Sequence, residues 1–81
     1  MVMQTKFDSL SEISALQSMA SSVEESVFLR TPDSHIMVDA KSFLGLFTLD
    51  FSHPVEVVTD SLYVIRRLEI MSRRKAAAAV R

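Results

Sequence analysis

The sequence predicts a two-layer α+β sandwich: a four-stranded, mostly antiparallel sheet that carries all of its helices on one face. The first observation is the order of the hydrophobic patterns, which alternate between strand-like and helix-like segments as β-α-β-β-α-β-α. The second is that the 81 residues include only one glycine and two prolines, so the chain has few loop signals and short connections. We expect the face of the sheet without helices to be solvated.

The first strand and helix have clear local signals. Residues 2–7 alternate loosely between apolar and polar side chains, as a strand does. Ser9 is followed three residues later by Glu12, a capping box in which each side chain satisfies a free backbone N–H at the start of a helix. An apolar stripe at helical spacing follows, made of Ile13, Leu16, Met19, Ala20 and Val23. We expect this stripe to face the core.

A hairpin and a short helix come next. Residues 26–30 and 35–39 are β-rich runs separated by a turn at residues 31–34, where proline presets the backbone angle. Residues 41–50 predict a helix of about nine residues, capped by Ser42. Leu46 and Leu49 would face inward, while three further apolar side chains would face another way: Phe43, Leu44 and Phe47.

The last strand and helix follow a proline. Residues 55–59 are β-branched and start directly after Pro54, as a strand would. Asp60 or Ser61 is expected to cap the final helix. Its inward face is predicted to contain Leu62, Ile65 and Leu68, followed by Met71 or Ser72. The five methionines are interpreted as core filler: Met1, Met3, Met19, Met37 and Met71.

Composition excludes several classes of protein. There is no cysteine, so disulfides and thiolate chemistry are absent. No apolar run approaches the roughly 20 residues of a membrane span, and we expect a soluble, cytoplasmic protein. Residues 1–75 are predicted to form one domain, followed by an alanine-rich tail at residues 76–81.

Catalytic chemistry has no visible basis in the sequence. No glycine-rich phosphate loop, metal-ligand set or nucleophile with a nearby base occurs, so we expect no enzyme, no cofactor and no metal. His35 and His53 are predicted to lie in exposed loops, and neither has a second ligand at a suitable spacing.

Charge is distributed unevenly along the chain. Residues 1–59 contain eight acidic and three basic side chains, a net charge of −5, whereas residues 60–81 contain two acidic and six basic ones, a net charge of +4. A small nucleic-acid-binding module that uses the basic C-terminal helix is therefore one hypothesis. Nucleic acid is an unlikely partner, because Phe28 is the only aromatic residue between the two hairpin strands. A solvated helix face is the simpler interpretation.

Residues 40–58 resemble part of the HPr phosphocarrier family of the phosphoenolpyruvate-dependent sugar phosphotransferase system. The similar features are a lysine-serine pair at Lys41 and Ser42, apolar residues on both sides of Gly45, Thr48-Leu49, and a strand at residues 55–58. The order of elements also matches this family, so the resemblance extends over residues 2–72. It implies an HPr-like, open-faced sandwich.

The resemblance also implies that carrier activity has been lost. The family's phosphorylatable histidine lies in a His-x-Arg-Pro-Ala segment, which an ungapped alignment places on residues 11–15. Ser11 then replaces the histidine, and Ile13 replaces the arginine that steadies the phosphoryl group. A serine with no adjacent base is a poor substitute for a neutral imidazole. We therefore expect a regulatory or protein-interaction relative.

Two further features follow from the resemblance. Ser42 matches a serine that a dedicated kinase phosphorylates in Gram-positive members, although a helix cap alone also explains a serine here. Phe43, Leu44 and Phe47 match the family's hydrophobic docking surface, for which a phosphotransferase component or a transcriptional regulator would be the partner. The alternative is that one or two of these side chains pack under the first helix or in a homodimer.

Overall fold

The structure, a computed structural model, describes residues 1–34 and 36–79 and contains the predicted elements in the predicted order. The elements are β1 (Val2–Thr5), α1 (Leu10–Ser21), β2 (Val27–Arg30), β3 (Val38–Asp39), α2 (Phe43–Leu46), β4 (Val55–Thr59) and α3 (Leu62–Ala79). The segment that we assigned to a tail, residues 76–81, continues α3 as far as Ala79. His35 and residues 80–81 lie outside the described residues.

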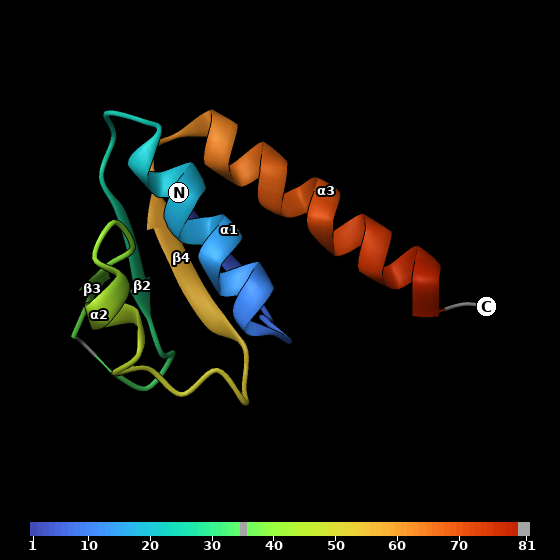
Figure 1. The fold of residues 1–81 in the computed structure, drawn as a ribbon, viewed down its shortest axis with the longest axis horizontal. Coiled ribbons are helices and arrows are strands. Elements are labelled where there is room, and N and C mark those ends of the chain that lie inside the picture. The colour runs from blue at the N-terminus through green and yellow to red at the C-terminus, as the bar shows by residue number, and fades with distance from the viewer. Residues whose placement is uncertain (35, 80–81) are drawn as a thin grey trace.

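The four strands form one open sheet in the order β1-β4-β2-β3, and every neighbouring pair is antiparallel. The helices cover one face of this sheet (Figure 1). Alternation along β4 shows the two faces, because Val55, Val57 and Thr59 are buried while Glu56 and Val58 between them are only partly covered. The expected α+β class with helices on one side is confirmed.

The core lies between the sheet and the helices. Phe7, the aromatic residue of the buried core, follows β1 and meets the partly buried Phe51 edge-on, with ring centroids 5.9 Å apart. The remaining buried apolar side chains come from every other part of the fold: Ile13, Leu16, Ala20, Val27, Leu29, Ala40, Leu46, Val55, Val57, Val64 and Leu68. The short chain therefore has a single core to which all three helices contribute.

Helix α1 begins as the capping signal predicts. The Ser9 hydroxyl accepts a hydrogen bond from the Glu12 backbone N–H, with 3.2 Å between Oγ and N. The Glu12 carboxylate accepts from the backbone N–H of Asp8, one residue before the cap, at 2.9 Å. Two free donors at the helix start are thus satisfied, and the predicted stripe with Ile13 and Leu16 is buried.

The inward face of helix α3 is rotated relative to the predicted one, so that it includes Val64 and excludes Leu62. Leu62 is 72 % exposed, whereas Val64 and Leu68 are fully buried. The cap residue Ser61 is itself buried and accepts a hydrogen bond from the Val64 N–H, and by helical spacing Val64 and Leu68 lie on the same inward face as Ser61. The inward stripe continues through Met71. The prediction was therefore right for Leu68 and Met71 and wrong for Leu62, while Ile65 is only partly buried.

The hairpin is present, but its second strand is shorter than expected. Strand β3 contains only Val38 and Asp39, which pair with Leu29 and Phe28 of β2. Two methionine predictions also fail, because Met1 is 49 % exposed and Met37 is 47 % exposed.

No helix among the described residues is long and apolar enough to cross a membrane.

Candidate functional site

The site that the sequence singles out is the short helix α2 with its cap. The Ser42 hydroxyl accepts a hydrogen bond from the Gly45 N–H at 3.3 Å, and the Ser42 carbonyl accepts from the Leu46 N–H at the same distance. Ser42 is exposed to solvent. The predicted N-cap is therefore confirmed, and its hydroxyl lies at the surface.

Helix α2 has four residues instead of the expected nine. After Leu46 the chain tightens into turns in which each N–H bonds the carbonyl three residues back, including the N–H of Thr48 to the carbonyl of Gly45 at 3.1 Å. The Thr48 hydroxyl donates to the same carbonyl at 2.7 Å. The Gly45 carbonyl is therefore used by this tight turn and not by a further turn of α-helix. Leu49 still packs against the core, as expected.

Three apolar side chains of this segment face solvent, and we call them the α2 patch: Phe43, Leu44 and Phe47. Their exposed fractions are 40 %, 84 % and 59 %. The rings of Phe43 and Phe47 stack on each other, with centroids 5.2 Å apart and planes 24° apart. Between them in the sequence, Leu46 is fully buried. None of the three belongs to the buried core, although Phe43 has more than half of its surface covered.

Close packing holds α2 in place. A Cβ atom added at Gly45 would lie 2.9 Å from Val38 Cγ1, so the absence of a side chain allows α2 to approach β3. Gly45 has no positive φ angle, and its role here is space. Lys41 fixes the segment from the other end, because its ammonium donates to the Val23 carbonyl at 3.0 Å and its own carbonyl accepts from Gln17.

Residues 11–15, on which the ungapped alignment with the HPr family places the phosphohistidine segment, lie at the start of helix α1. Ser11 is exposed in the first turn of α1, whereas Ile13 is buried in the core. The Ile13 side chain therefore points away from the surface on which Ser11 lies. A phosphoryl group at Ser11 would not be stabilised by the residue at the arginine position.

A charged cluster ties α3 to the start of α1. The Lys75 ammonium lies 2.6 Å from Asp8 Oδ2 and 3.1 Å from Glu12 Oε1, and it also donates to the Lys6 carbonyl. Hydrogen bonds from Lys75 and Lys6 lower the pKa of Asp8. Burial acts to lower the pKa of Lys75, but its hydrogen bonds to Asp8 and Glu12 raise it overall. Sequence reasoning missed this cluster, because Lys75 lies more than 60 positions from its partners Lys6, Asp8 and Glu12.

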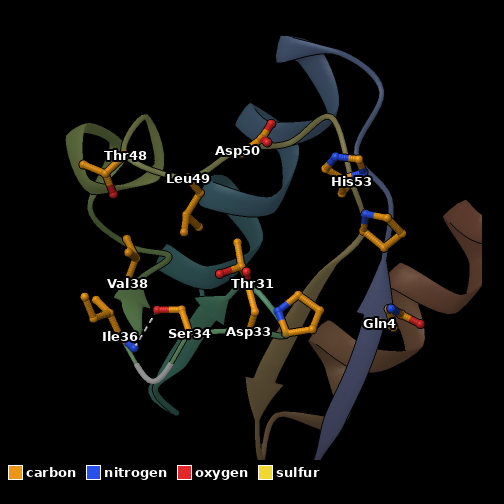
Figure 2. A pocket seen from close by; sticks show the side chains of 12 residues that line it. Gln4, Thr31, Asp33, Ser34, Ile36, Val38, Thr48, Leu49, Asp50 and His53 are labelled. Carbon is orange, nitrogen blue, oxygen red and sulfur yellow. Dashed lines mark hydrogen bonds between the residues drawn. The ribbon is translucent and has the colours of Figure 1, made fainter.

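A second feature that the sequence did not reveal is a cavity of about 810 Å³ between the loop after β2, the turn after α2 and the approach to β4 (Figure 2). Val38 and Leu49 contribute apolar walls, and Asp33, Asp50 and exposed His53 contribute polar groups. Hydrogen bonds from Ser52 lower the pKa of Asp50. Among residues 1–34 and 36–79, no three His, Asp or Glu side chains could hold a metal ion.

Neither a protein-family model, nor a curated protein, nor a solved structure matches this chain.

Proposed function

We propose that this chain is an HPr-like protein-interaction domain whose partner protein docks on the α2 patch. The observation that carries the proposal is the exposure of Phe43, Leu44 and Phe47 on a segment whose remaining leucines pack inward. A contiguous exposed apolar patch often marks an interaction site, and aromatic side chains are enriched at protein interfaces. The resemblance to HPr supports the same surface and favours a phosphotransferase component or a transcriptional regulator as the partner.

Rigid support of the patch favours docking. Leu46 anchors α2 in the core, Gly45 brings it against Val38, and Lys41 ties its start to the end of α1. The backbone that carries the patch is therefore held in place, which lowers the entropy cost of binding. A mobile loop with the same side chains would lose more freedom on association.

The docking surface can be tested by capture followed by reconstitution. Wild-type protein and the double variant Phe43→Ser, Phe47→Ser are immobilised and exposed to extract from the cells that produce the chain, and the captured protein is then purified. The matched control is Val2→Ser with Met37→Ser, which removes two exposed apolar side chains outside α2.

The proposal requires that the purified partner bind the wild type and the control but not the α2 double variant. Equal binding to all three proteins, or no partner that binds after purification, would refute it. Sedimentation analysis of the wild type alone tests the homodimer alternative, which predicts a concentration-dependent dimer that the α2 substitutions abolish.

Loss of phosphocarrier activity is the second part of the proposal, because Ser11 and Ile13 occupy the carrier positions. Incubation with phosphoenolpyruvate and the first enzyme of the phosphotransferase system should leave the chain without phosphate. Phosphate mapped by mass spectrometry to Ser11, His35 or His53 would contradict this expectation.

Ser42 is proposed as a regulatory phosphorylation site beside the α2 patch. Its hydroxyl is exposed and adjacent in sequence to Phe43, and a phosphate there would add up to two negative charges at the edge of an apolar interface. Mass spectrometry of the protein isolated from growing cells should find phosphate on Ser42. A chain that remains unmodified at Ser42 under all growth conditions would limit this residue to its capping role.

A further inference from the structure

The outer surface between α1 and α3 contains a groove of about 340 Å³, separate from the α2 patch. We call it the arginine groove and define it by six of the side chains that line it: Ala15 and Met19 of α1, and Arg67, Ile70, Met71 and Arg74 of α3. Met19 and Met71 also pack against the core, so the floor of the groove is apolar. Figure 1 shows α1 and α3 on the same side of the sheet, with the C-terminal part of α3 extending beyond it.

The two arginines of the groove give it a specific charge pattern. Arg67 and Arg74 are seven residues apart, which places them on the same side of α3 about 10.5 Å apart along the helix axis. Within the described part of the chain, neither guanidinium forms an ion pair. Lys75, the next residue, is by contrast paired with Asp8 and Glu12. The charge of the lysine is compensated within the fold, and that of the two arginines is available to a partner.

We propose that the arginine groove binds an acidic amphipathic helix of a partner protein. Two carboxylates two turns apart on that helix would match Arg67 and Arg74, since guanidinium and carboxylate form strong charge-assisted hydrogen bonds. Apolar side chains between those carboxylates would cover Ile70 and the two methionines. This is the helix-in-groove mode of recognition, in which apolar anchors recur every three or four residues.

The apolar floor distinguishes this partner from nucleic acid. Phosphates would satisfy Arg67 and Arg74, but none of the described residues that line the groove is an aromatic side chain on which bases could stack. Methionine side chains are flexible and polarisable, and they adapt well to apolar side chains of a partner. Charge and floor together therefore favour an acidic peptide.

The same helix provides a matched control for the experiment. Arg66 and Arg73 are also seven residues apart, and they are exposed on the side of α3 that faces away from the sheet. Reversing either arginine pair changes the net charge of the protein by the same amount. Only reversal of Arg67 and Arg74 changes the groove.

The probe is a designed, fluorescently labelled helical peptide with two glutamates seven positions apart and leucines between them. Fluorescence anisotropy at physiological salt measures the binding of this peptide to three proteins. They are the wild type, the double variant with Arg67→Glu and Arg74→Glu, and the double variant with Arg66→Glu and Arg73→Glu. A second peptide carries glutamine at both glutamate positions and is tested with the wild type. A single-stranded oligonucleotide of equal charge is measured in parallel.

We expect groove reversal to weaken peptide binding by about tenfold or more and reversal of the outer pair to weaken it by less than about threefold. The glutamine peptide should bind the wild type at least about tenfold more weakly, a comparison that does not depend on the folding of any variant. Equal losses from both reversals, or no binding of the glutamate peptide to the wild type, would overturn the proposal. Tighter binding of the oligonucleotide, lost equally with both reversals, would assign this face to nucleic acid instead.

Discussion

Two leucines of α2 provide a sharp test of the docking surface, because they have the same chemistry and opposite environments. Leu46 is fully buried, while Leu44, two positions earlier, is 84 % exposed. Replacing a buried leucine by alanine costs about 2–5 kcal/mol, since transfer and cavity terms add. Burying a whole leucine contributes about 1.5–3 kcal/mol, so the small buried fraction of Leu44 predicts a loss below about 0.5 kcal/mol for Leu44→Ala.

Urea denaturation followed by circular dichroism measures the free energy of unfolding of both variants. The expected result is a large loss for Leu46→Ala and almost none for Leu44→Ala. A short domain with a total stability of about 5–15 kcal/mol resolves this difference easily. A Leu44→Ala loss comparable to that of Leu46→Ala would mean that Leu44 is covered in solution, and the reasoning that makes it part of a free docking surface would fail.

Three further predictions concern Gly45 in α2, the cap of α3 and the interaction of Lys75 with Asp8. Gly45→Ala should destabilise the fold by about 1–3 kcal/mol, because the new Cβ meets Val38 Cγ1 at 2.9 Å; adding Val38→Ala should relieve this strain in a double-mutant cycle, and strictly additive losses would contradict the contact. Ser61→Ala should cost about 1 kcal/mol in urea denaturation through loss of the α3 cap, and an unchanged midpoint would show that the cap contributes nothing. Lys75→Met should raise the pKa of Asp8 toward its ordinary value of 3.8 in an NMR titration. In the wild type the stability from this depressed pKa is present above 3.8 and is lost as the pH falls through the folded-state pKa, so an Asp8 titration that is identical in both proteins would exclude the interaction.

Local signals predicted most of the fold correctly. The Ser9 and Glu12 pair marked the start of α1, and the β-branched run after Pro54 gave β4 with its observed bounds. Prediction failed where tertiary contacts decide. Leu62 fits an apolar helical stripe, but the structure buries Ser61 and Val64 and exposes Leu62. Both orientations place Leu68 inward, so the periodicity in the sequence does not distinguish them.

The candidate site was only partly visible in the sequence. The pattern around Gly45 indicated more apolar side chains than one stripe absorbs, but it left the core and the surface open as places for Phe43 and Phe47. In the structure Phe47 is 59 % exposed, whereas Phe43 is 40 % exposed and has more than half of its surface covered. The arginine groove could not be predicted, because it depends on how α1 and α3 lie together, and sequence spacing relates Arg67 to Arg74 but neither of them to Met19.

The central claim is that a partner protein docks on the α2 patch. Its most direct test compares the affinity of the purified captured partner for two variants, in each of which one exposed leucine is replaced by serine. Leu44→Ser changes the α2 patch, and Leu62→Ser changes a leucine of α3 that is 72 % exposed. Burying an exposed leucine in an interface contributes about 1.5–3 kcal/mol, so calorimetric titration should show binding to Leu44→Ser weakened by about tenfold or more relative to the wild type. Binding to Leu62→Ser should be unchanged. Wild-type affinity in the Leu44→Ser variant would contradict the assignment of α2 as the docking surface.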